Sequence, residues 1–174
     1  MMEIYIPDIY QKNIYTINYN MLISRGIKCL LFDLDNTLIT VIEKYPKEET
    51  KTLFRNLKEE GFKIVIFSNS PKIRVKAFAK ELNVDYIFTA KKPHVEKMLE
   101  FIRTNKFELS EIAIIGDSMM DDVLCGNTVG ITTILTDQLD KKEFPLARLR
   151  RIKEKMIQKK LRDEDLFVKG RYYE

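Results

Sequence analysis

Lys28-Cys29-Leu30-Leu31-Phe32-Asp33-Leu34-Asp35-Asn36-Thr37-Leu38 is the stretch of this sequence that decides the fold. Its first part, Lys28 to Phe32, is almost entirely apolar, which is typical of a strand covered by helices on both faces of a parallel sheet. Two acidic residues, Asp33 and Asp35, follow this run directly. Because ligands of open α/β sheets bind beyond the carboxyl ends of the strands, we expect these carboxylates to project into a binding crevice.

Similar apolar runs recur along the chain and alternate with segments of helical periodicity. This alternation predicts a doubly wound, Rossmann-like α/β fold with a mainly parallel, five-stranded sheet. The expected strands are Lys28 to Phe32, Phe62 to Phe67, Asp85 to Phe88, Glu111 to Ile115 and Thr132 to Leu135. The expected helices between them are Lys47 to Glu60, Pro71 to Leu82, His94 to Lys106 and about Asp121 to Asn127.

A length of 174 residues corresponds to a single domain. The composition, 45% hydrophobic and 32% charged, is that of a globular protein and excludes a disordered chain. We expect an irregular N-terminal segment, residues 1–26, that packs on the core and ends in a short helix near Gly26. The catalytic core should span residues 27–140, and a basic helix and tail should follow over residues 141–174.

The sequence also indicates the compartment. Cys29 and Cys125 lie in apolar stretches without nearby zinc ligands, as expected of reduced core cysteines. The acidic N-terminus, with Glu3 and Asp8, does not resemble a signal peptide, and no apolar run approaches the roughly 18 to 20 residues of a membrane-spanning helix. We therefore expect a cytoplasmic protein that is at most peripheral on the inner face of a membrane.

Polar residues follow the next three predicted strands as well. Ser68-Asn69-Ser70 comes after the second strand, Lys91-Lys92-Pro93 after the third, and Gly116-Asp117 with Asp121 and Asp122 after the fourth. If the first and fourth strands are neighbours, the carboxylates converge, and clustered carboxylate oxygens suit Mg²⁺. A carboxylate pair, a hydroxyl and an ammonium group together can perform phosphoryl transfer.

In such a reaction Asp33 can attack phosphorus and form an aspartyl phosphate, and Asp35 can serve as general acid and then as base. Taken singly, each residue also has an ordinary structural explanation. The Asp-x-Asp pair favours turns, Ser68 can cap the helix at Pro71, and Lys92 can be a solvated lysine. Their occurrence at four successive strand ends favours catalysis.

These motifs resemble those of the haloacid dehalogenase-like (HAD) phosphatase superfamily, class IIIA, of the YqeG or mitochondrial phosphatidylglycerophosphate phosphatase type. The resemblance implies that Asp33 is the nucleophile and Asp35 the acid/base. It implies that Mg²⁺ is held by Asp33, the backbone carbonyl of Asp35 and Asp117. The residues expected to bind the phosphate are Thr37, Ser68, Asn69 and Lys92.

Two details of the resemblance affect the site. Relatives often carry Thr where this chain has Asp121, so the supporting carboxylate is Asp121 or Asp122, and we favour Asp122. The intervals between the motifs are filled by one helix and one strand each, so no cap domain is expected and the site should be open. His94, the single histidine, follows the third motif, either beside the phosphate or as a surface residue at a helix start.

The positive charge is concentrated at the C-terminus. Residues 1–139 hold 18 basic and 19 acidic residues, whereas residues 140–174 hold 12 and 7. A helix starting at Pro145 would carry a narrow apolar stripe, and a basic amphipathic helix can bind an anionic membrane. Alternatively the stripe packs on the sheet or on a second subunit, while nucleic-acid binding is disfavoured because residues 145–162 contain no aromatic residue and no recognised nucleic-acid-binding module. The stripe consists of Leu146, Leu149, Ile152, Met156 and Leu161.

The expected activity is Mg²⁺-dependent hydrolysis of a phosphomonoester, and the resemblance favours phosphatidylglycerophosphate as substrate. The same residues would hydrolyse a soluble sugar phosphate or a nucleotide. A non-enzymatic phosphoacceptor, such as a receiver domain, is the competing class. In a receiver the acceptor Asp follows the third strand and the lysine follows the fifth, whereas here Asp33 follows the first and Lys92 the third.

Overall fold

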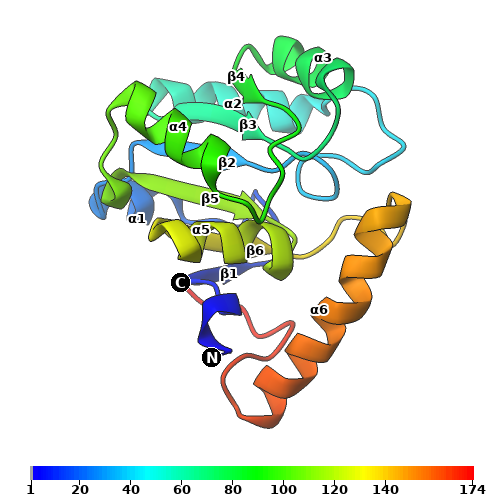
Figure 1. The fold of residues 1–174 in the computed structure, drawn as a ribbon. Helices are drawn as coiled ribbons and strands as arrows, with labels where there is room; N and C mark the ends of the chain where they lie inside the picture. Colours follow the sequence, from blue (N-terminus) through cyan, green and yellow to red (C-terminus); the bar gives the residue numbers. More distant parts are fainter. Residues whose placement is uncertain (1) are drawn as a thin grey trace.

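The computed structural model describes residues 2–174, without the side chain of Leu146. Its centre is a six-stranded, entirely parallel sheet with the strand order β1-β6-β5-β2-β3-β4 (Figure 1). All five predicted strands are present, and β1 is additional. The strands are β1 (Ile9–Gln11), β2 (Cys29–Phe32), β3 (Lys63–Phe67), β4 (Asp85–Ile87), β5 (Ile112–Gly116) and β6 (Thr132–Thr136).

Strand β1 corrects the prediction that residues before α1 are irregular. It pairs in parallel with β6, and Asp8 supports the pair by accepting a 2.8 Å hydrogen bond from the backbone N–H of Thr133. Three residues are too few to produce a readable apolar alternation, which explains why the strand was missed. The short helix expected before Gly26 is confirmed as α1 (Tyr19–Ser24).

Helices cover both faces of the sheet. In β2, Leu30 and Phe32 face the core built with α1, α2 and α3, whereas Cys29 and Leu31 face the core built with α4 and α5 (Figure 1). Both cores are apolar, so β2 has the continuous hydrophobicity from which the fold was predicted. The helices are α2 (Glu48–Glu59), α3 (Lys72–Leu82), α4 (Glu96–Asn105) and α5 (Leu124–Val129), the last preceded by a π-helical turn (Met119–Val123).

Strand β2 lies between β3 and β5, which confirms that the first and fourth predicted strands are neighbours. The polar residues that follow these strands therefore meet at one edge of the sheet. Within residues 2–174 no segment forms a cap domain over this edge. The helix α6 (Pro145–Asp163) instead runs past the carboxyl ends of the strands (Figure 1).

Helix α6 turns several of its apolar side chains away from the molecule. Leu149, Ile152 and Met156 are 63%, 57% and 63% exposed, whereas Leu161 is buried. Packing of these three side chains on the sheet, one of the arrangements that the sequence left open, is therefore wrong. Leu146, the first member of the predicted stripe, lies outside the described side chains.

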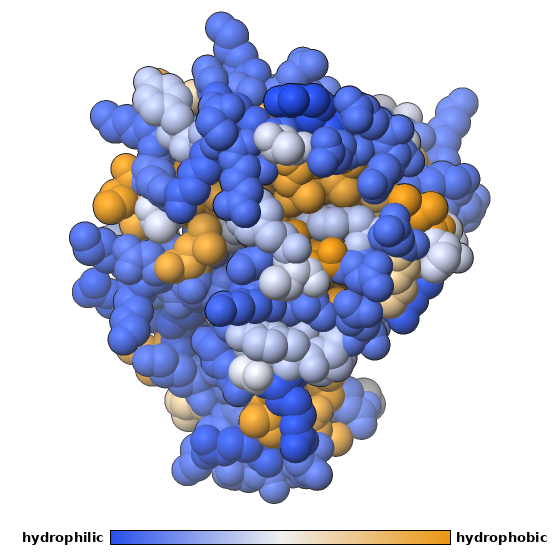
Figure 2. All heavy atoms as spheres, turned by 180° about the vertical axis from the view of Figure 1, so that it is seen from behind, coloured by the Kyte–Doolittle hydropathy of each residue, from blue (hydrophilic) through white to orange (hydrophobic). Residues whose placement is uncertain are grey.

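The face of the molecule shown in Figure 2 is mostly hydrophilic, with apolar side chains gathered in several patches. In the part of the chain that the structure describes, no helix has the length and apolar character needed to cross a membrane.

Candidate active site

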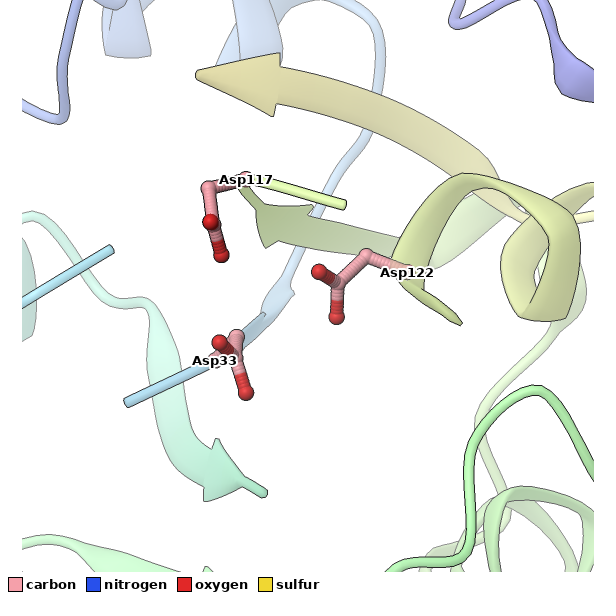
Figure 3. A group of neighbouring side chains, drawn as sticks. All are labelled: Asp33, Asp117 and Asp122. Carbon is pink, nitrogen blue, oxygen red and sulfur yellow. The ribbon is translucent and has the colours of Figure 1, made fainter. Parts of the chain in front are cut away.

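Three carboxylates converge where β2 and β5 end. Asp33 follows β2, Asp117 follows β5, and Asp122 lies in the π-helical turn after β5, and all three side chains point toward a common centre (Figure 3). Each offers an oxygen that lies within 4.8 Å of the others. Burial raises the pKa of Asp117 and of Asp122, since a desolvated carboxylate prefers its neutral form unless a cation is near.

Lys92 supplies positive charge to this cluster. Its Nζ donates hydrogen bonds to Asp33 Oδ1 at 2.8 Å and to Asp122 Oδ1 at 2.5 Å, and its side chain is almost fully buried. Burial alone would lower the pKa of Lys92, but the charges of Asp122 and Asp33 outweigh it and raise that pKa. The ammonium group therefore stays charged.

Asn69 fixes the backbone from which Lys92 projects. Its Oδ1 accepts from the Lys92 N–H at 2.7 Å, and its Nδ2 donates to the Lys92 carbonyl at 3.1 Å. Both ends of the Asn69 amide are thus engaged in orienting Lys92, although the residue also lines the cavity above the site.

Gly116, the last residue of β5, gives Asp122 its position. A Cβ atom at Gly116 would lie 2.0 Å from Asp122 Cγ, so only glycine leaves room for this carboxylate against the strand end. Asp122 Oδ2 also accepts a 3.1 Å hydrogen bond from the Ser118 N–H. Asp121, the alternative supporting residue, instead pairs with Arg150 at the cavity wall, so the structure brings Asp122 to the cluster.

Asp35 faces a different set of partners from Asp33. Arg74 Nε and Nη2 donate to Asp35 Oδ1 at 2.8 and 2.6 Å, and the Ser70 hydroxyl donates to Asp35 Oδ2. Burial nevertheless raises the pKa of Asp35, against the opposing effects of Ser70 and Arg74. A raised pKa favours the protonated form that a general acid needs.

Thr37 and Ser68 contribute hydroxyl groups. The Thr37 hydroxyl lies 3.1 Å from Asp117 Oδ1 and 3.5 Å from Asp33 Oδ2, between two members of the cluster. Ser68 is buried, lines the cavity and accepts a hydrogen bond from the Ser70 N–H at 3.1 Å. It does not cap α3, since the residue before this helix is Pro71 and no side chain caps it.

Arg151 of α6 reaches Asp117 from outside the sheet. Its Nη1 donates to the Asp117 carbonyl at 2.8 Å, and its Nη2 pairs with Asp117 Oδ2. Glu143 and Glu154 hold the same guanidinium at 2.6 and 3.0 Å. Helix α6 is therefore joined to the site by a buried ionic network.

A cavity of about 660 Å³ opens above these groups. Its floor holds Asp33, Asp117 and Lys92, and α6 forms one wall through Ala147 and Arg150. Oxygen ligands next to a fixed ammonium group can neutralise a phosphate and a divalent cation together. The donor set of Asp33, Asp117 and Asp122 consists of carboxylate oxygens alone, which fits Mg²⁺.

The molecule is a phosphatase, a phosphoric monoester hydrolase, and its parallel sheet is the fold of HAD phosphatases. Comparison with known families gives a narrower assignment. The chain belongs to the family described as mitochondrial PGP (phosphatidylglycerophosphate) phosphatase, whose model matches residues 2–140.

Two relatives are similar over most of this chain. The probable phosphatase YqeG of Bacillus subtilis (strain 168) is 32% identical over 155 residues, covering 89% of this chain and 90% of the relative. The phosphatidylglycerophosphate phosphatase 1, chloroplastic/mitochondrial, of Arabidopsis thaliana is 28% identical over an alignment of 180 positions that covers 90% of this chain and 48% of the relative.

Solved structures support the fold. The HAD phosphatase of Thermococcus onnurineus matches with a TM-score of 0.55 at 17% identity, covering 72% of this chain and 97% of that one. An uncharacterized protein of Listeria monocytogenes serotype 4b matches with a TM-score of 0.54 at 17% identity, covering 76% of this chain and 99% of that one.

Sequence reasoning did not single out Arg74 or Arg151 as site residues. Arg74 lies three positions after Pro71, in the first turn of α3 and next to a strand end. This position in the sequence could have indicated that Arg74 is a site residue. Arg151 and Glu154 are one helical turn apart, but nothing in their spacing indicates contact with Asp117, 34 positions earlier. His94 is an exposed residue just before α4, and it also lines the cavity.

Proposed function

We propose that this phosphatase uses Asp33 as nucleophile, Asp35 as acid/base and Mg²⁺ as cofactor, and that its substrate is phosphatidylglycerophosphate. The observation that supports the catalytic assignment is the difference between the two aspartates. Asp33 accepts a hydrogen bond from the charged Lys92, whereas Asp35 is buried with a raised pKa. A nucleophile held beside a fixed positive charge and a carboxyl group that retains its proton are what the reaction requires.

In the first step a carboxylate oxygen of Asp33 forms a bond to phosphorus while the bond from phosphorus to the ester oxygen breaks. Asp35 donates its proton to that leaving oxygen. In the second step Asp35 removes a proton from a water molecule whose oxygen forms a bond to phosphorus. The bond from phosphorus to the Asp33 oxygen breaks, so inorganic phosphate leaves and the Asp33 carboxylate is restored. Lys92 and Ser68 would hold the phosphoryl oxygens during both steps.

The residues that would hold Mg²⁺ are Asp33, Asp117 and the backbone carbonyl of Asp35, with Asp122 in support. When bound, the ion would neutralise negative charge on the phosphate and on the carboxylate cluster. Thr37 would keep the carboxylates of Asp33 and Asp117 at a fixed separation, and Arg151 would hold the outer oxygen of Asp117.

A lipid substrate is supported by the surroundings of the cavity mouth as well as by the name of the Arabidopsis relative. Val41 and Phe144 line the cavity, and the neighbouring Ile42 and Ile73 are 64% and 83% exposed. Arg74 brings these segments together, since it donates to the Glu43 carbonyl and lies over the Phe144 ring. Exposed apolar side chains beside an uncapped site suit a substrate that is presented in a membrane. We place the protein at the inner, cytoplasmic face of that membrane.

The test is phosphate release from a panel of substrates with Mg²⁺ present. We expect kcat/KM for phosphatidylglycerophosphate in anionic mixed micelles to exceed that for soluble sugar phosphates and nucleotides at least ~10-fold. Equal or higher values for a soluble substrate would contradict the lipid assignment. Release of a single phosphate per chain, without further turnover, would instead identify a phosphoacceptor.

A further inference from the structure

The outward face of α6 combines exposed apolar side chains with unpaired positive charge. Leu149, Ile152 and Met156 follow one another at helical spacings of three and four residues, so they lie on one side of the helix. All three are more than half exposed. Single exposed apolar residues are common on protein surfaces, whereas a continuous row of them marks a site of interaction.

Basic residues border this row on both sides. At 3.6 residues per turn, Arg148, Lys155 and Lys159 lie along one border, and Lys153 and Lys160 along the other. All five are exposed, and none forms an ion pair with another described residue. Their charge is therefore available to a partner.

Acidic residues are absent from this face. Between residues 148 and 160 the single acidic residue is Glu154, which lies on the opposite side of the helix, is 3% exposed and is bound by Arg151 and Ser118. The face is thus apolar at its centre and purely cationic at its borders.

The orientation of the helix is fixed by its inward side. Arg151 binds Asp117, Leu161 is buried, and Asn36 ties the segment before α6 by donating to the Lys142 carbonyl at 2.9 Å. Rotating the apolar row inward would break these contacts and would bury cations. The outward face therefore has no partner within the described chain.

We propose that this face of α6 is a docking surface for an anionic lipid bilayer. Apolar side chains can enter the boundary between headgroups and acyl chains while lysine and arginine side chains stay with the lipid phosphates. A dry protein interface would have to desolvate the same five cations, so the charge pattern favours lipid. The role of this docking rests on the proposed function.

Docking would bring the catalytic cavity to the substrate. Ala147 and Arg150 line the cavity from α6, the same helix whose other side would lie on the bilayer. Since a helix with side chains is about 10–12 Å across, the cavity would lie one helix diameter from the surface. A phosphate group at the end of a lipid headgroup could enter it without the lipid leaving the membrane.

The test uses the chain of 174 residues and two kinds of sedimentable vesicle, one of phosphatidylcholine and one of equimolar phosphatidylcholine and phosphatidylglycerol. We expect binding to the anionic vesicles and little binding to the neutral ones. The variant with Leu149→Gln, Ile152→Gln and Met156→Gln should bind at least ~10-fold more weakly. The double variant Lys153→Gln with Lys155→Gln should bind about 25-fold more weakly, since each charge near such a surface contributes about fivefold.

Matched controls separate docking from folding and from catalysis. Lys76→Gln with Lys80→Gln removes the same charge from exposed positions on α3 and should leave vesicle binding unchanged. All variants should hydrolyse a soluble aryl phosphate at the wild-type rate. Equal binding to neutral vesicles, or undiminished binding of the Gln triple variant, would overturn the proposal. So would a dimer that this variant converts to a monomer, because a second copy would then cover the face.

The two proposals can fail separately. Vesicle binding that depends on α6, without turnover of phosphatidylglycerophosphate, would refute the substrate and leave the docking surface. Turnover of the lipid in detergent micelles, without vesicle binding, would refute the docking surface alone.

Discussion

Strand β2 and helix α6 both contribute to the site, yet they bury opposite kinds of side chain. In β2 the apolar residues are buried on both faces, and the polar residues follow at its end. In α6 the ionic residue Glu154 is buried and its partner Arg151 is partly buried, whereas the apolar Leu149 and Met156 are exposed. The apolar residues of an element can therefore be predicted to be buried where the element is part of, or covers, a hydrophobic sheet. The same prediction is wrong where the element covers a charged site.

The largest effect should come from the end of β2. Asp33→Asn removes the nucleophile with little change in shape, and we expect kcat on an aryl phosphate to fall on the order of 10⁴-fold. Asp85→Asn, an exposed carboxylate on β4, is the control and should retain the wild-type rate. Comparable rates for Asp33→Asn and the wild type would remove Asp33 from the mechanism.

Asp35→Asn should distinguish acid catalysis from a general loss of the site. With an alkyl phosphate, whose leaving group needs a proton, kcat should fall about 10²- to 10⁴-fold. With p-nitrophenyl phosphate, whose leaving group needs none, the loss in formation of the aspartyl phosphate should be much smaller. Equal losses with both substrates in single-turnover measurements would argue against the role of Asp35 as acid.

Gly116→Ala tests how the end of β5 positions Asp122. The new Cβ would collide with the Asp122 carboxyl group, so the carboxylate must move and its contact with Lys92 should be lost. We expect kcat to fall about 10²-fold, as for other displaced catalytic groups. In a double-mutant cycle, Gly116→Ala should cause little further loss when Asp122→Ala is already present. Additive losses would show that the collision is not the cause.

Arg151→Gln tests the ionic side of α6. Removing one partner from a buried ionic network costs about 3 kcal/mol, which corresponds to roughly 6–12 °C in the melting temperature of a chain of this size. Because Asp117 then lacks its compensating charge, Mg²⁺ should raise the melting temperature of Arg151→Gln more than that of the wild type. Arg148 is exposed on the same helix, so Arg148→Gln should leave both the melting temperature and its Mg²⁺-induced rise unchanged. An equal Mg²⁺-induced rise in all three proteins would contradict the proposed link between α6 and the metal site.

Most of the sheet could be predicted from the sequence because its strands lie in apolar runs that are followed by distinctive polar residues. Asp33, Ser68, Lys92 and Asp117 were placed at strand ends, and the parallel sheet brings those ends together. Strand β1 was not predictable, since three residues in an aromatic segment produce no clear period.

The contribution of α6 could not be predicted for a different reason. Its apolar stripe was read correctly as helical, but which side faces the molecule depends on charges that are distant in sequence. Arg151 is one of 30 basic residues in the chain. It can be identified as a site residue only when Asp117, Glu143 and Glu154 are known to lie near it in space. Specific ion pairs between distant segments leave no periodic signal.

The smallest effect should come from an exposed apolar side chain of α6, and its contrast with a buried one on the same helix tests the comparison directly. Leu161→Ala should lower the free energy of unfolding by about 2–4 kcal/mol, because this side chain is fully buried against Tyr10 and Phe167. Leu149→Ala deletes the same atoms from an exposed position, so its effect should stay within about 0.5 kcal/mol. Both values follow from urea unfolding of the full chain, with unchanged slopes indicating that the unfolded states are comparable. Equal losses at the two positions would mean that Leu149 is buried in solution and that the helix lies with its apolar side inward.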